Sequence, residues 1–137
     1  MKPTNAMKCS KADFWFSRMI RLRDADENGC AKCCTCGVYK PVKEMDCGHW
    51  IKRQHQATRF SEMNCATQCK KCNAFEQGRD AEFERFLVGK YGQDKIDWLK
   101  MQGKSTLKRS GFDLTYLAVY FKQKATELSR EKGIELW

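Results

Sequence analysis

Several features that would mark a secreted or membrane protein are missing from this sequence. It contains no long apolar run, and a membrane-spanning helix needs about 20 consecutive apolar residues. The N-terminal segment from Met1 to Asn5 has no apolar stretch that could act as a secretion signal. The nine cysteines form an odd set, which does not suit a secreted disulfide scaffold. We therefore expect a cytoplasmic protein, without a membrane partner, whose cysteines are metal ligands or small buried hydrophobes.

Acidic residues are in the minority. The 137 residues include 26 Lys and Arg against 17 Asp and Glu, which gives a formal net charge of +9. Small basic domains most often bind polyanions, because phosphate contacts release counterions and supply affinity. A solvated basic surface without such a partner is the simpler alternative.

The order of motifs along the chain predicts an α+β fold. Residues 1–9 are expected to be a frayed lead-in to an N-terminal helix at 10–28, opened by a capping box from Ser10 to Asp13. Short strands suit the cysteine-rich core at 30–78, and the remainder, 79–137, has helical periodicity. A chain of this length can bury one core, so we expect a single domain, 1–137, with a small zinc-stabilised module flanked by α-helices.

The last predicted helix has the clearest apolar stripe in the chain. Asp113 is expected to cap it and Gly133 to end it. The stripe favours burial against a second copy and hence a homodimer, although covering the zinc module within one chain is the alternative. The stripe consists of Leu114, Leu117, Ala118, Phe121, Ala125 and Leu128.

Two Cys-x-x-Cys motifs predict one structural zinc ion. Cys69 and Cys72 form one pair, and Cys33 with Cys36 is the preferred partner pair because Gly37 permits a tight turn. Cys30 with Cys33 stays open as the alternative pair. Taken alone, such a clamp is typical of a binding module without catalysis. The cysteines interpreted as non-ligands are Cys9, Cys34, Cys47 and Cys65.

Three polar residues in and beside the clamp indicate phosphodiester chemistry. His49 is a candidate general base, and Asn64 lies far enough along to return on a second strand. Asn73 begins a predicted short helix, where its side-chain oxygen is a reasonable Mg²⁺ ligand. The only other histidine, His55, is interpreted as a surface or phosphate-contacting residue.

The order His, Asn, then Cys-x-x-Cys-Asn resembles the HNH, or ββα-metal, nucleases, and its third Asn resembles the phage endonuclease VII branch. The segments Asp46-Cys47-Gly48-His49-Trp50, Thr58-Arg59-Phe60 and Gln68-Cys69-Lys70-Lys71-Cys72-Asn73 are similar to the NinG (Rap) family of lambdoid phage recombination proteins. This resemblance implies that His49 is the base, that Asn64 orients it and that Asn73 binds a catalytic Mg²⁺ or Mn²⁺. Asp46 is the expected second ligand, with a water, Glu76 or another carboxylate as the alternative.

The resemblance also implies a function. It predicts an endonuclease that acts on branched DNA, such as Holliday junctions and D-loops, during phage recombination in a bacterial host. An HNH nuclease or nickase on ordinary duplex and a non-catalytic zinc module that binds DNA are the alternatives. Clustered basic residues around the motifs are expected to contact DNA phosphates: Lys52, Arg53, Arg59, Lys70, Lys71 and Arg79.

Overall fold

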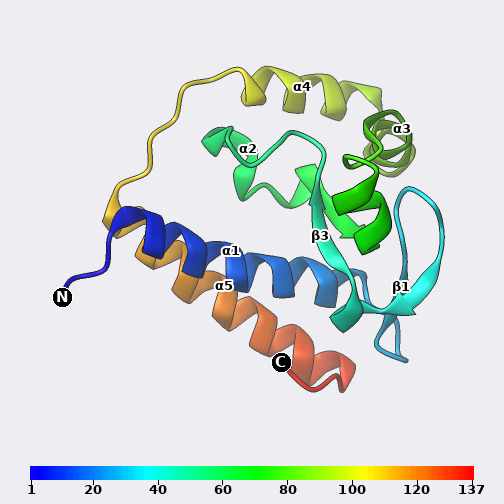
Figure 1. The fold of residues 1–137 in the computed structure, drawn as a ribbon, viewed down its shortest axis with the longest axis horizontal. Helices are drawn as coiled ribbons and strands as arrows, with labels where there is room; N and C mark the ends of the chain where they lie inside the picture. Colours follow the sequence, from blue (N-terminus) through cyan, green and yellow to red (C-terminus); the bar gives the residue numbers. More distant parts are fainter.

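The computed structural model describes all residues, 1–137, and has the mixed helix and strand content that the sequence predicts (Figure 1). No helix in it is both long and apolar enough to cross a membrane. The elements in chain order are α1 (Asn5–Asp24), β1 (Cys30–Lys32), β2 (Tyr39–Pro41), η1 (Val42–Glu44), β3 (Asp46–His49), α2 (Gln56–Arg59), η2 (Glu62–Asn64), β4 (Cys65–Gln68), η3 (Lys71–Phe75), α3 (Asp80–Tyr91), α4 (Gln93–Gly103) and α5 (Gly111–Lys132).

The strands form two separate antiparallel pairs, β1 with β2 and β3 with β4. β4 is buried along its whole length, and its alternate residues face opposite layers. Cys65 packs with the core under α1 and α5, whereas Ala66 packs with the core under α3 and α4. The β3–β4 pair is thus held between two helical layers.

The first helix is longer at its N-terminus than the sequence predicts. The Thr4 side chain accepts a hydrogen bond from the Met7 N–H at 3.2 Å, so α1 begins at Asn5. The expected capping box at Ser10 to Asp13 is wrong, because those residues lie inside the helix. The helix also ends earlier than predicted, at Asp24, since Ala25 is already extended.

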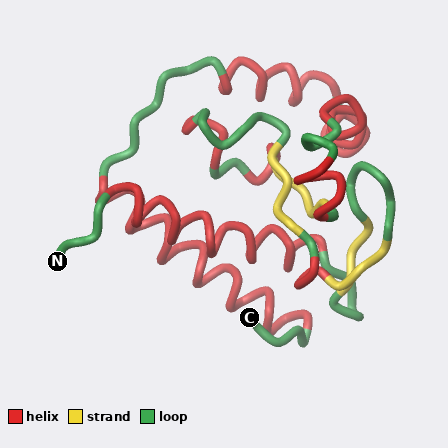
Figure 2. The backbone as a smooth tube through the Cα atoms, in the orientation of Figure 1, coloured by secondary structure: helices red, strands yellow, loops and turns green.

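The last helix packs against the first, and the two run side by side in the same direction (Figures 1 and 2). The Phe16 and Phe121 ring centroids lie 4.9 Å apart at the centre of the contact. At the far end the Lys132 ammonium donates to the carbonyl oxygen of Leu22 at 2.7 Å. The apolar stripe of α5 is therefore occupied by α1 within the chain. A homodimer, which stays a prediction, would have to use another face.

The caps of α5 differ from the prediction at one end. Ser110, not Asp113, is the N-cap: its hydroxyl accepts from the Asp113 N–H, and the Asp113 carboxylate accepts from the Ser110 N–H, both at 3.1 Å. Asp113 therefore closes a capping box from the third helical position. Gly133 ends the helix with a φ of +65°, as predicted.

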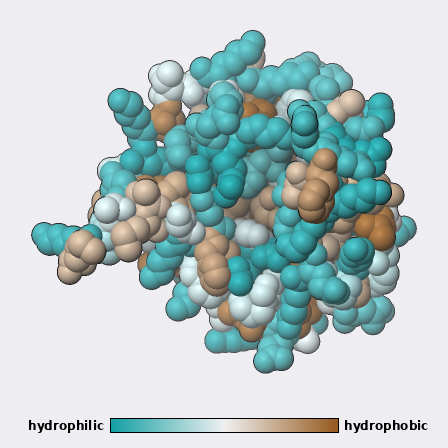
Figure 3. Space-filling model, in the orientation of Figure 1, coloured by the Kyte–Doolittle hydropathy of each residue, from teal (hydrophilic) through white to brown (hydrophobic).

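Polar side chains cover most of the face seen in Figure 3, with apolar patches scattered between them. A long connection from α4 to α5, residues 104–110, arches over one side of the molecule (Figure 2). Its Arg109 donates to the Gln56 carbonyl oxygen at 3.1 Å, which ties the connection to α2.

Candidate active site and zinc centre

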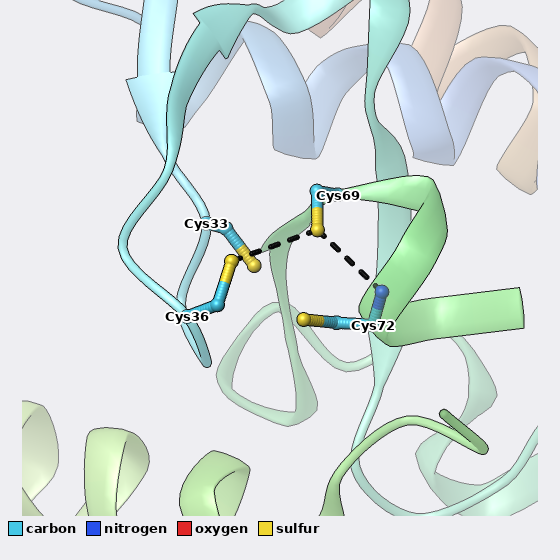
Figure 4. Close-up of side chains that lie close together, drawn as sticks. All are labelled: Cys33, Cys36, Cys69 and Cys72. Carbon is cyan, nitrogen blue, oxygen red and sulfur yellow. Dashed lines mark hydrogen bonds between the residues drawn. The ribbon is translucent and has the colours of Figure 1, made fainter. Parts of the chain in front are cut away.

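The predicted zinc ligands come together. Cys33 and Cys36 lie in the turn after β1, while Cys69 and Cys72 lie where β4 passes into η3. The four sulfur atoms all lie within 4.8 Å of one another, and Figure 4 shows them converging from the two segments. Four thiolates in this arrangement suit a tetrahedral structural zinc ion. Cys30 is not part of this cluster, so the alternative pairing is not the one the structure favours.

The surroundings of the cluster shift its thiols in opposite directions: burial raises the pKa of Cys69 to about 12 and also raises that of Cys36, whereas the pKa of Cys33 is lowered. Burial alone would raise the pKa of the Cys33 thiol, but backbone N–H groups of Cys69 and Cys36 and the Thr35 hydroxyl lower it to about 6. The Arg79 guanidinium also donates to the Cys72 sulfur at 3.9 Å. Both contacts supply positive potential where zinc would hold its ligands.

Arg79, which the sequence predicts to contact DNA, also makes several contacts within the protein. Its backbone lies in the left-handed region, with a φ of +49°, as the residue preceding α3. Its side chain contacts Cys72 and also pairs with Glu76 at 3.3 Å and Glu82 at 3.5 Å. These three contacts hold the segment from Cys72 to Glu76 against the start of α3.

The candidate base and the two candidate Mg²⁺ ligands line one pocket of about 690 Å³. Its lining includes His49 and Asp46 from β3 and Asn73 from η3. The Asn73 side-chain amide donates to one Asp46 carboxylate oxygen at 3.0 Å, and Lys70 donates to the other at 2.7 Å. The antiparallel register opposes Asp46 to Gln68 at the end of β4, which brings η3 beside the start of β3. Asp46 and Asn73 are thus neighbours, although 27 positions separate them in sequence.

The alternative carboxylate, Glu76, is directed elsewhere. It pairs with Arg79 at 3.3 Å and Lys71 at 3.7 Å, and it does not line the pocket. Of the two acidic candidates, only Asp46 stands beside Asn73.

The His49 ring is fixed by a backbone carbonyl. Its Nε2 lies 2.8 Å from the Arg59 carbonyl oxygen, which can only accept a hydrogen bond, so Nε2 carries the proton. The ring also packs against Phe16, with 6.0 Å between the ring centroids. Burial lowers the pKa of His49, and the hydrogen bond to Arg59 opposes this shift. The result is a neutral imidazole with Nδ1 as its free acceptor.

The sequence analysis expected Asn64 on the second strand. In the structure it lies at the end of η2, directly before β4. It is completely buried and bonded to the loop that follows His49. Its side-chain oxygen accepts from the Ile51 N–H at 2.8 Å, and its amide donates to the Ile51 and Thr58 carbonyl oxygens at 2.9 and 3.2 Å. Asn64 therefore closes the loop that carries the Arg59 carbonyl, and it acts on His49 only through that loop.

Gly48 is required by close packing. A Cβ at this position would lie 2.4 Å from the Gln68 side-chain oxygen and 3.0 Å from the Phe83 ring. The residue before His49 therefore faces α3 and not the pocket. No carboxylate fits at that position, which leaves Asp46 as the acidic side chain of β3.

The basic residues differ in how accessible they are. Lys52 and Arg53 line the pocket, and the Arg53 side chain is 61% exposed. Lys71 is exposed on η3, and Lys70 is exposed directly before it. Arg59 is only 17% exposed, because it pairs with Asp13 and donates to the Arg53 carbonyl oxygen at 3.0 Å. Arg59 thus supports the loop, and its predicted contact with DNA phosphates stays a prediction.

Asp13 is a pocket residue that the sequence analysis missed. It projects from α1, lines the pocket beside His49 and pairs with Arg59 and Arg53. No local motif marks it, because it reaches the site only through the packing of α1 against β3. Gln54, from the loop after β3, and Gln77, from the loop after η3, also line the pocket.

Together, the fold and the cysteine cluster define a small α+β protein with a tetrad suited to a structural zinc ion. The chain matches the family model of the bacteriophage lambda NinG protein over residues 2–131. The chain therefore belongs to the NinG family. No curated protein and no solved structure matches it significantly.

Proposed function

We propose that this protein is a metal-dependent endonuclease of the HNH, or ββα-metal, type. The observation that carries the proposal is that His49, Asp46 and Asn73 line one pocket. Asn73 directly follows Cys72 of the tetrad in η3, so the cysteine cluster holds the segment that carries it. The order β3, β4 and η3 supplies the two strands and the short helix that such a module needs. A module that only binds DNA has no need for a neutral histidine in the same pocket as a pair of oxygen ligands.

The pocket fits a hard divalent cation. Asp46 and Asn73 offer a carboxylate and a carboxamide oxygen, and Mg²⁺ prefers oxygen ligands while keeping several of its waters. The two side chains are already adjacent, at 3.0 Å, so both can face one ion after the Asn73 amide turns. A Mg²⁺ or Mn²⁺ ion held there would supply positive charge beside the scissile phosphate.

His49 is the group that would take a proton. Its Nδ1 is unprotonated and accepts the proton of an attacking water, while the Arg59 carbonyl stabilises the resulting imidazolium through Nε2–H. The low pKa of His49 keeps the ring ready as a base near neutral pH. Lys52 and Arg53, at the edge of the pocket, are placed to hold the phosphates on either side.

Branched DNA is the proposed substrate class, and phage recombination in the bacterial cytoplasm is the proposed setting. Membership of a phage family supports the setting, and the +9 charge supports a nucleic-acid partner. Cleavage of ordinary duplex is the alternative that the same site chemistry permits.

The test compares wild type with His49→Ala on a supercoiled plasmid and on a labelled four-way junction, each with Mg²⁺ or Mn²⁺. We expect the wild type to nick DNA only with the cation, and His49→Ala to be slower by at least about 100-fold with similar DNA affinity. Near wild-type nicking by His49→Ala would refute the assignment of the base.

Unlabelled junction and linear duplex then compete for the labelled junction at moderate salt. Junction should compete more strongly than duplex if branched DNA is the substrate. Equal competition would leave a general duplex nuclease.

A further inference from the structure

A second cluster of metal-ligating side chains lies beside the candidate active site. The Cys47 and Cys65 sulfur atoms and a ring nitrogen of His49 all lie within 4.8 Å of one another. The four cysteine sulfur atoms of the tetrad meet the same upper limit. The register explains the cluster, because His49 opposes Cys65 and Cys47 is two residues before His49 on the same face of β3.

The chemistry of this cluster differs from that of the Asp46 and Asn73 pair. Two thiols and an imidazole are ligands for a thiophilic cation such as Zn²⁺, whereas Mg²⁺ prefers oxygen. Three protein ligands leave a fourth coordination position, which water can fill. Cys47 lines the pocket, so solvent reaches the cluster from that side.

The hydrogen bond of His49 suits a ligand role. Histidines that bind metals almost always donate their other ring N–H to a carbonyl or carboxylate, which fixes the tautomer. His49 Nε2 makes such a bond to the Arg59 carbonyl oxygen at 2.8 Å, so Nδ1 is the nitrogen available to a metal. The same lone pair serves the proposed base.

We propose that Cys47, His49 and Cys65 form a second, weaker site for a thiophilic divalent cation, and that filling it blocks His49 as a base. Binding releases the two thiol protons to solvent and places the metal on Nδ1. The site is weaker than the tetrad because it has three protein ligands instead of four. The metal site itself stands on the geometry of the cluster, and only its inhibitory effect rests on the proposed nuclease function.

Cobalt binding tests the site without any assay of activity. Protein already loaded with one zinc ion is titrated with Co²⁺, which does not compete well with zinc at the tetrad. We expect wild type to bind one equivalent of Co²⁺ with thiolate-to-metal charge-transfer absorption. Cys47→Ser and Cys65→Ser should lose this absorption while keeping their zinc ion. Cys9→Ser, which changes a cysteine outside both clusters, should keep it.

Absence of the absorption in wild type would overturn the proposal, and so would its persistence in both cluster variants. Retained zinc shows that the variants are folded. Because Cys47 is half-buried whereas Cys65 is buried, the Cys47 variant keeps the test valid if Cys65→Ser does not fold.

Zinc inhibition of nicking tests the consequence. With Mg²⁺ present, added Zn²⁺ should inhibit the wild type, and Cys47→Ser should need at least about tenfold more Zn²⁺ for half-inhibition relative to its own zinc-free rate. Equal sensitivity would refute the proposed block of His49. Cobalt binding by a protein that never nicks DNA would support the metal site and count against the nuclease.

Discussion

The His49 Nε2 atom and the Arg59 carbonyl oxygen lie 2.8 Å apart, across a loop that Asn64 closes. This bond fixes which ring nitrogen carries the proton and leaves Nδ1 free. Because a carbonyl oxygen can only accept a hydrogen bond, it holds the neutral ring in one tautomer, and protonation then takes place at Nδ1. The loop therefore fixes the tautomer of His49 and so determines which ring nitrogen can accept a proton.

The first prediction concerns the pH dependence of nicking. Burial lowers the pKa of His49 from its ordinary value of 6.5, so the neutral, basic form persists to lower pH than in an exposed histidine. The rate should rise with pH along a limb centred below 6.5 and become independent of His49 at neutral pH. Single-turnover nicking between about pH 5 and about pH 8 measures this limb.

The same shift affects stability with a definite sign. In the window between the lowered folded pKa and the unfolded pKa, the unfolded chain binds more protons, so the free energy of unfolding rises with pH. His49→Ala should remove this contribution. A rate limb centred above pH 6.5 would contradict the buried, neutral state assigned to His49.

The second prediction concerns the two proposed oxygen ligands, Asp46 and Asn73, with Glu76 as the comparison. Asp46→Asn and Asn73→Ala should lower the nicking rate, and raising Mg²⁺ or Mn²⁺ should partly restore Asn73→Ala, because one ligand remains. Glu76→Gln is the matched control: Glu76 lies near Asn73 in sequence but pairs with Arg79 outside the pocket. It should keep its metal dependence. A metal requirement that changes with Glu76 and not with Asp46 would reverse the assignment.

The third prediction concerns the structural metal. The purified protein should hold about one zinc ion per chain, and a strong chelator should unfold it, because the metal supplies folding free energy. Cys36→Ser and Cys69→Ser should lose zinc and soluble fold, whereas Cys30→Ser, outside the tetrad, should keep both. Metal content by mass spectrometry and unfolding by circular dichroism provide the measurements. Zinc loss from Cys30→Ser with retention in Cys36→Ser would restore the alternative pairing.

How much could be read from the sequence depended on how local each signal was. The tetrad was predictable because the two residues inside each Cys-x-x-Cys fix its geometry. The partner of α5 was not, since an apolar stripe does not say which surface covers it. The start of α1 was misplaced because Ser10 to Asp13 is a good cap sequence, but Thr4 already provides a cap about 1.7 turns earlier.

The pocket residues could likewise be predicted only in part from the sequence. His49 and Asn73 could be proposed from their order along the chain, and Asp46 only as the nearest carboxylate. The strand register is what brings Asp46 beside Asn73, and helix packing is what brings in Asp13. Neither is encoded in a short motif.

The last prediction distinguishes the role of Asn64 from that of a residue that contacts substrate. Asn64→Ala removes a buried amide and leaves the Ile51 N–H and carbonyl oxygen without their partner, while the Thr58 carbonyl oxygen keeps the Ser61 N–H as a donor. Each buried group left unsatisfied costs about 1–3 kcal/mol, so urea unfolding should show a loss of at least that size. Nicking should fall as well, because the Arg59 carbonyl is no longer held under His49. Asn73→Ala, the same substitution at the pocket, should lower nicking while leaving the free energy of unfolding nearly unchanged. If Asn64→Ala were as stable as wild type and still inactive, Asn64 would act on the reaction itself and not through the loop.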